Sequence, residues 1–173
     1  MKRAYLVLGP ESSGTRWLTG LLIKAGCSGS DDHVQPWDTM LPANEPLVAW
    51  RRSFPHGGEW PNVKHLVTAL RARHYEITAL VMTRDWFAMS RSQAQFQPAE
   101  DVADNIQRAY RQIFMGLTQT QTAFVVVSYE AALVHPAAFV NSLLGYLGLG
   151  VTLDAATIGA IDGNAKWYEQ VTA

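Results

Sequence analysis

Residues 9–17, with the sequence GPESSGTRW, decide the fold of this chain. A short apolar run, residues 4–8, precedes them, and the segment that follows carries Leu18, Leu21 and Leu22. Leucines at that spacing lie on one face of a helix, whereas a short continuous apolar run is typical of a buried strand. Residues 9–17, called the 9–17 loop below, are therefore predicted to join a buried strand to the first turn of a helix.

The 9–17 loop has the composition of an anion-binding loop, with glycines at Gly9 and Gly14 and hydroxyl side chains between and after them. Backbone N–H groups in such a loop, together with the N-terminus of the next helix, favour phosphate or sulfate. In the ATP- and GTP-binding form GxxxxGK[ST], a lysine follows the second glycine. Here Thr15 and Arg16 follow it. The sequence predicts a phosphate loop of another kind, and a glycine-rich turn without a ligand is the alternative.

The composition excludes several classes of protein. The chain has 173 residues, of which 48% are apolar, and a formal net charge of −1. This length suits one domain, residues 1–173, with a sizeable core, and the near-neutral charge gives no sign of a nucleic-acid partner. The single cysteine, Cys27, excludes an intrachain disulfide framework. The five apolar residues before Gly9 are too few for a signal peptide or a membrane span, so we expect a cytoplasmic protein with no membrane partner.

Strand and helix patterns alternate along the chain. Apolar runs typical of buried parallel strands occupy residues 4–8, 47–50, 77–82 and 123–127. Helical patterns occupy residues 15–25, 62–73, 86–95, 99–118 and 136–147. This order predicts an α/β fold of the three-layer, P-loop type, in which helices flank a central, mostly parallel sheet. Two irregular stretches, residues 26–46 and 52–61, are long enough to carry a binding function or to cover a site.

A second candidate site follows the third apolar run, where the sequence reads Thr83-Arg84-Asp85. Ligands of open α/β sheets lie outside the carboxyl ends of the strands, so Arg84 should face the same crevice as the 9–17 loop. A guanidinium there can hold a phosphate with two hydrogen bonds, and the Ser92 hydroxyl can add a neutral donor. Alternatively, Arg84 and Asp85 form a pair that closes the strand end, and Ser92 is an exposed helix residue.

These two segments resemble the sulfotransferases that use 3′-phosphoadenosine 5′-phosphosulfate (PAPS). Residues 13–18, SGTRWL, match the second half of the family's loop, GxPKSGTTWL, and Arg84 and Ser92 match the arginine and serine of its 3′-phosphate motif, RDPxDxxxS. Tyr129-Glu130 and the later LGL at 147–149 match a third element. The resemblance implies a P-loop fold, PAPS as cosubstrate and no metal. It also implies sulfuryl transfer to a hydroxyl or amine of an unknown acceptor, such as a carbohydrate or a small molecule.

The resemblance also implies which residues bind the nucleotide. They are Ser12, Ser13, Gly14, Thr15, Arg16, Trp17, Arg84, Ser92 and Lys166. The family has a lysine where this chain has Ser12, and that lysine stabilises the leaving phosphate. Arg16 can neutralise the same charge, although it is too weak an acid to donate its proton readily. Lys166 either folds back over the nucleotide or is a solvated lysine on a packed tail.

A base must accept the proton of the acceptor. His56 is the first candidate for this catalytic role, because many sulfotransferases carry a histidine at the end of the strand before the 3′-phosphate arginine; the alternative is a surface histidine. His33 and Glu11 are the further candidates. The side chains expected to bind the acceptor are Arg51, Arg52, Trp37 and Trp60, although tryptophans more often cover the core.

Two other functions stay open. A small-molecule or nucleotide kinase would use Thr15 and Asp85 to hold magnesium, but the loop lysine that it needs is missing. A catalytically degenerate module would bind the nucleotide without turnover, which Ser12 in place of lysine favours. Loss of a base should lower the rate of an enzyme by orders of magnitude and leave its nucleotide affinity largely intact.

Overall fold

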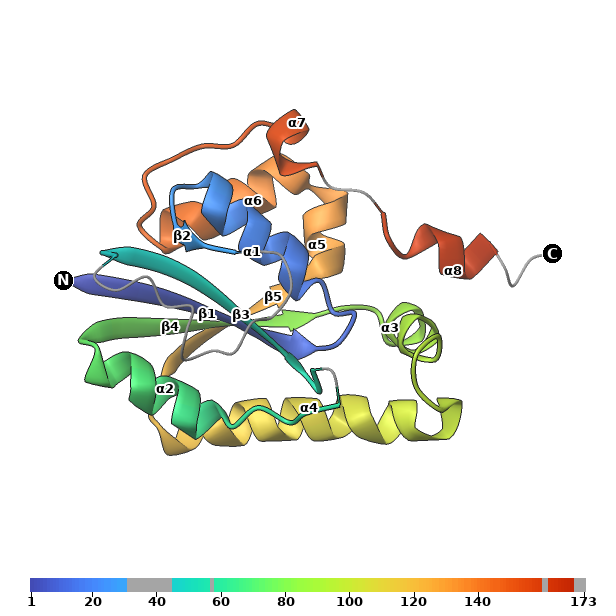
Figure 1. The fold of residues 1–173 in the computed structure, drawn as a ribbon. Helices are drawn as coiled ribbons and strands as arrows, with labels where there is room; N and C mark the ends of the chain where they lie inside the picture. The colour runs from blue at the N-terminus through green and yellow to red at the C-terminus, as the bar shows by residue number, and fades with distance from the viewer. Residues whose placement is uncertain (31–44, 57, 160–161, 170–173) are drawn as a thin grey trace.

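The computed structural model describes residues 1–30, 45–56, 58–159 and 162–169. Within them, five strands form one parallel sheet in the order β2-β3-β1-β4-β5, as Figure 1 shows. The strands are β1 (Lys2–Pro10), β2 (Ser28–Gly29), β3 (Leu47–Phe54), β4 (Tyr75–Thr83) and β5 (Ala123–Ser128). The carboxyl ends of β1, β3 and β4 therefore meet at the same edge of the sheet, where the 9–17 loop and Arg84 follow their strands.

Helices cover both faces of the sheet. They are α1 (Thr15–Lys24), α2 (Val63–Ala72), α3 (Trp86–Gln93), α4 (Ala99–Gln119), α5 (Tyr129–Val134), α6 (Pro136–Tyr146), α7 (Ala155–Ile158) and α8 (Ala165–Glu169). In Figure 1, α1, α5, α6 and α7 lie on one side of the sheet and α2 and α4 on the other, while α3 and α8 lie beyond the carboxyl ends of the strands. The predicted three-layer α/β fold is thus confirmed.

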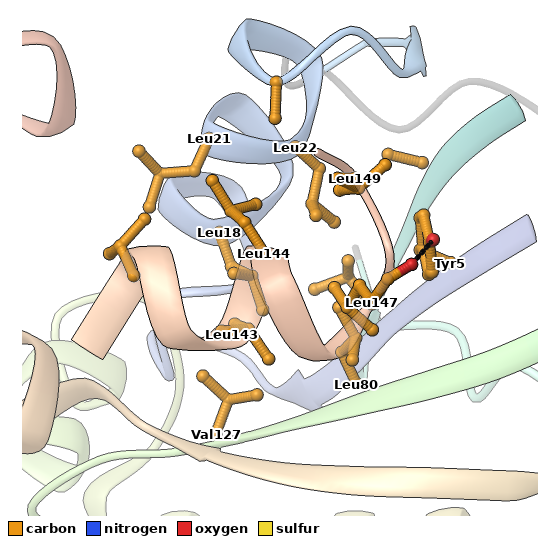
Figure 2. Packing of buried hydrophobic residues seen from close by; sticks show 14 of the residues in the cluster. Tyr5, Leu18, Leu21, Leu22, Leu80, Val127, Leu143, Leu144, Leu147 and Leu149 are labelled. Atoms are coloured by element: carbon orange, nitrogen blue, oxygen red, sulfur yellow. Dashed lines mark hydrogen bonds between the residues drawn. The ribbon is translucent and has the colours of Figure 1, made fainter. Parts of the chain in front are cut away.

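The core is divided by the sheet because successive strand residues point to opposite faces. On β1, Tyr5 and Val7 pack toward α1 and α6, whereas Ala4, Leu6 and Leu8 pack toward α2 and α4. Figure 2 shows the first of these two layers, in which leucines of α1 and α6 interdigitate above the sheet. Each fully buried side chain of this kind contributes about 1.5–3 kcal/mol, so these contacts hold α1 and the loop before it against the sheet.

The structure corrects one expectation and adds elements that the sequence pattern did not indicate. The fourth apolar run was expected to be buried on both faces, but the side chains of Phe124 and Val126 on β5 are 45% and 51% exposed. β5 is an edge strand, and the helices of that face pack over β1, β3 and β4 instead. The two-residue strand β2 and the short helices α5, α7 and α8 carry too few residues for a periodic signal.

Helix α3 begins directly after β4 because Asp85 caps its N-terminus, accepting a hydrogen bond of 2.8 Å from the Ala88 N–H. Burial by itself raises the pKa of the Asp85 carboxyl. Hydrogen bonds from the Ala88 and Phe87 N–H groups and from the Tyr168 hydroxyl outweigh burial and hold this pKa below its usual 3.8. Asp85 therefore joins α3 to α8 while it is ionised.

Replacing Asp85 by Ala should lower the free energy of unfolding by about 1 kcal/mol at pH 7, the usual cost of losing an N-cap. Because the folded protein has the lower pKa, the stabilisation by Asp85 is present above the unfolded value and is lost as the pH falls through the folded value. In urea unfolding, the difference in free energy of unfolding between the wild type and Asp85→Ala should therefore become smaller below about pH 4. Asp85→Asn, which keeps a capping oxygen, is the control and should cost less at pH 7.

Candidate functional site

A cavity of about 520 Å³ opens at the carboxyl edge of the sheet beside α1. Its walls come from the 9–17 loop, one side of α1 from its first residue to its last, the end of β3, Arg84, Tyr129 and the end of α7. Segments far apart in the sequence therefore meet here. The crevice that the sequence predicted between the loop and Arg84 exists, and both of them line it.

Backbone conformation shapes the 9–17 loop. Ser12 and Gly14 adopt positive φ values of 65° and 95°. A side chain at Gly9 would displace the Ser13 hydroxyl and crowd the Cβ of Met82 at 3.1 Å, so glycine suits this position. Gly14 is the N-cap of α1 and makes no side-chain capping bond, so the first N–H groups of α1 are presented as donors at this edge.

Four cationic side chains line the cavity: Arg16 and Lys24 on α1, Arg51 on β3, and Arg84 after β4. The lining residues within the described ranges include no aspartate and no glutamate. Lys24 is held in place by a hydrogen bond of 2.7 Å from its Nζ to the Thr157 carbonyl. A cavity with four cations and a helix N-terminus favours a ligand with more than one negative charge.

The end of β3 contributes a residue that sequence reasoning missed. The Ser53 hydroxyl lies 3.2 Å from the Thr15 hydroxyl, and both side chains are buried. The two meet because β1 and β3 pair in parallel with Gly9 opposite Ser53. This register is a tertiary feature, and no local pattern around Ser53 signals it.

The Arg84 guanidinium is held by three protein oxygens. Its Nη1 donates to the Ser12 carbonyl at 2.7 Å, its Nη2 to the Gly163 carbonyl at 2.7 Å, and its Nε to Oδ1 of Asn164 at 2.6 Å. The guanidinium also lies 5.0 Å from the centre of the Tyr129 ring. The Nε–Nη2 edge, one of the two edges that can hold a phosphate with two hydrogen bonds, thus faces two oxygens of the C-terminal segment.

That C-terminal segment is anchored from two further sides. Asn164 is 6% exposed, and its Nδ2 donates to Oε1 of Glu130 at 3.0 Å. The same Glu130 oxygen accepts from the Asp85 N–H at 2.7 Å, while the Gly163 N–H donates to the Tyr129 hydroxyl at 3.3 Å. The segment after residue 161 therefore folds back onto the crevice by Gly163 and Asn164.

Lys166, predicted to make that contact, lies elsewhere. It is exposed on α8 with its Nζ 4.3 Å from the centre of the Trp167 ring. Ser92 is half-buried on α3, and Ser13, within the 9–17 loop, is fully buried. Lys166, Ser92 and Ser13 are not among the described residues that line the cavity, whereas Ser12, Gly14, Thr15, Arg16, Trp17 and Arg84 are.

The two described candidates for the base follow neighbouring strand ends. Glu11 comes after β1 and His56 after β3, whose last residues Pro10 and Phe54 are paired. The Glu11 N–H donates to the Phe54 carbonyl at 3.2 Å. Both side chains are half-buried, and neither residue is among the described residues that line the cavity. His33 and Trp37 lie outside the described residues.

The candidates for acceptor binding separate because strand residues alternate. Arg51 lines the cavity, whereas Arg52 is buried on the opposite face with its guanidinium 5.5 Å from the centre of the Trp50 ring. Trp60 lines a different cavity of about 260 Å³ between α2 and α4, where Arg108 lies 3.9 Å from the centre of its ring. Of the three described candidates, the structure brings Arg51 to the 9–17 loop.

The described parts of the chain contain no candidate membrane span and no candidate metal site. No helix there combines the length and apolar character that crossing a bilayer requires. No group of three or more His, Cys, Asp and Glu side chains is arranged there so as to hold a metal ion.

No protein-family model matches the sequence, and no curated protein matches it. Among solved structures, the mouse sulfotransferase SULT7A1 complexed with PAP aligns with 98% of this chain at 12% sequence identity and a TM-score of 0.49. The aligned region covers 65% of that protein, so this chain spans about two-thirds of its length or slightly less. A likeness of this size identifies no residue, ligand or activity of this chain.

Proposed function

We propose that this chain binds PAPS in the 520 Å³ cavity and transfers its sulfuryl group to a hydroxyl or amine of an acceptor. One observation carries the proposal. The 9–17 loop, the N-terminus of α1 and four cationic side chains surround a single cavity, to which the described lining residues bring no carboxylate. PAPS carries negative charge at both its 5′ and 3′ groups, which suits cations that come from three separate segments.

The cavity has the size and the mixed walls that a nucleotide requires. Its volume lies within the range of small-molecule sites. We assign the phosphosulfate to the 9–17 loop and Arg16, and the 3′-phosphate to Arg84. Apolar side chains of Trp17, Leu21 and Ile158 line the remaining wall and suit the base of the nucleotide.

Binding at Arg84 requires an exchange of partners. The Gly163 carbonyl and the Asn164 amide oxygen hold the guanidinium edge that we assign to the 3′-phosphate. A phosphate offers two oxygens with charge and therefore forms stronger hydrogen bonds to a guanidinium than these neutral acceptors. We expect the phosphate to replace them while the Nη1 bond to Ser12 persists.

In the proposed reaction, the acceptor oxygen or nitrogen forms a bond to sulfur as the bond between sulfur and the 5′-phosphate oxygen breaks. The bonding electrons stay on the phosphate, and the acceptor proton passes to the base, which we assign to His56 with Glu11 as the second candidate. The helix N-terminus and Arg16 stabilise the charge that develops on the leaving phosphate. The products are the sulfated acceptor and 3′-phosphoadenosine 5′-phosphate, abbreviated PAP.

A binding module without turnover is the second candidate. Ser12 stands where the family lysine would be, and its carbonyl is held by Arg84, so the position supplies no cation to the leaving group. A kinase is less well supported, because the Thr15 hydroxyl that it would use for magnesium is already engaged with Ser53.

Thermal unfolding with PAP tests the binding half of the proposal. PAP at about one hundred times its dissociation constant should add roughly 2.7 kcal/mol to the stability and raise Tm by about 5–10 °C. Arg16→Ala removes a cation from the cavity and should reduce this rise. Arg111→Ala, an exposed arginine on α4, is the matched control and should leave it unchanged. If ATP–Mg²⁺ raises Tm and PAP does not, the sulfotransferase proposal is wrong and the kinase function is favoured.

Asn164→Ala tests whether the C-terminal segment competes for Arg84. The variant removes one of the two oxygens on the Nε–Nη2 edge. Titration calorimetry should show PAP binding a few-fold more tightly to Asn164→Ala than to the wild type. In the variant, the phosphate has one fewer hydrogen bond to Arg84 to displace. Weaker binding would mean that Asn164 supports the nucleotide instead of competing with it.

His56→Ala tests turnover. If His56 accepts the proton, this variant should lose about 100-fold or more in kcat with a labelled sulfuryl donor and a panel of carbohydrate and small-molecule acceptors. Its affinity for PAP should equal that of the wild type. His74→Ala, an exposed histidine before β4, is the control and should keep full activity. Equal rates in both variants would remove His56 from the mechanism.

A further inference from the structure

A fully buried glutamine contacts the 9–17 loop, and the proposed chemistry gives it no role. Gln93 is the last residue of α3 and is 0% exposed. Its Nε2 donates to the Glu11 carbonyl at 2.6 Å, across 82 residues of sequence. A buried amide costs free energy unless it is hydrogen-bonded, so packing of α3 alone would be served better by an apolar side chain.

The orientation of Gln93 is set by a relay of three amides. Its Oε1 accepts from Nε2 of Gln97 at 2.6 Å, and Oε1 of Gln97 accepts from Nδ2 of Asn105 at 2.7 Å. Because a backbone carbonyl only accepts, Gln93 must present its NH₂ group to Glu11. Each amide behind it then has one consistent orientation. The relay fixes the Gln93 donor against the loop from the side of α4.

Gln93 acts together with Arg84 on two successive peptide groups. Gln93 holds the carbonyl of Glu11, and Nη1 of Arg84 holds the carbonyl of Ser12 at 2.7 Å. In a trans peptide the carbonyl and the next N–H point in opposite directions. A carbonyl that is held toward α3 and β4 therefore keeps its lone pairs away from an anion on the other side of the loop.

This restraint matters because the loop is strained. Ser12 has a φ of 65°, a left-handed conformation that costs an L-residue with a Cβ about 1–2 kcal/mol. Such a conformation persists only where the surroundings determine it. Here, the hydrogen bonds from Gln93 to the Glu11 carbonyl and from Arg84 to the Ser12 carbonyl hold Ser12 in this conformation.

We infer that Gln93 is a positioning residue of the 9–17 loop, which sets the loop for an anion by holding the Glu11 carbonyl. The anion is the phosphosulfate of the proposed function, and the link to affinity rests on that proposal. The effect on the loop itself rests only on the hydrogen bonds described.

Gln93→Met keeps the length and removes the donor. In the ligand-free protein, the ¹H–¹⁵N amide signals of residues 12–14 should shift and their hydrogen exchange should quicken. PAP affinity should fall about five-fold, the effect of one hydrogen bond. Gln95→Met changes an exposed glutamine two residues after the end of the same helix. It is the control and should change neither the amide signals nor the PAP affinity.

Gln97→Met is a milder variant that breaks the relay one residue further from the loop, for use if Gln93→Met does not fold. It should shift the same amides in the same direction by a smaller amount. Unchanged amides of residues 12–14 in a folded Gln93→Met, or in Gln97→Met if the first does not fold, would overturn the inference even if PAP binds. If PAP does not bind the wild type while those amides respond to Gln93→Met, the proposed function fails and the role of Gln93 stands.

Discussion

The guanidinium of Arg84 is the contact on which the rest of the site depends. Its planar fork donates to the Ser12 carbonyl, the Gly163 carbonyl and the Asn164 side chain, and it packs on the ring of Tyr129. Each of its three nitrogens donates one hydrogen bond to an acceptor from the 9–17 loop or the C-terminal segment. A partly buried cation requires such acceptors, because an unpaired charge in the same place would be costly. Arg84 therefore links the loop to the C-terminal segment, each of which is also held by other side chains.

The parallel sheet explains why so many cations gather at one edge. β1, β3 and β4 all end there, and each is followed by a polar residue or a loop that has no place in the core. Gathering four cations around one cavity is unfavourable through charge repulsion, which salt and solvent reduce. Packing of the buried leucines of α1 and α6, which Figure 2 shows, offsets this repulsion. Helix α1 thus contributes both to the core and to the site, and Leu21 belongs to both.

Much of the fold could be predicted from the sequence, and the reasons are local. The 9–17 loop lies between a strand and a helix as expected. The spacing of Leu18, Leu21 and Leu22 indicates the helix, and the apolar run of residues 4–8 indicates the strand. The expectation that β5 is buried on both faces was wrong, because an apolar strand has the same pattern at an edge as in the centre. Phe124 and Val126 stay about half exposed on this edge strand, although the ring of Phe114 on α4 contacts that of Phe124.

By itself, the sequence determined the loop, its glycines and the alternation of strand and helix, because these depend on neighbours within a few residues. Only the tertiary structure decided which side chains meet. Arg51 and not Arg52 reaches the cavity because the face of β3 is set by packing, and Ser53 meets Thr15 through strand register. Gln93 reaches Glu11 over 82 residues. Hydrogen bonds between distant segments depend on how whole layers pack, and no local period in the chain records that.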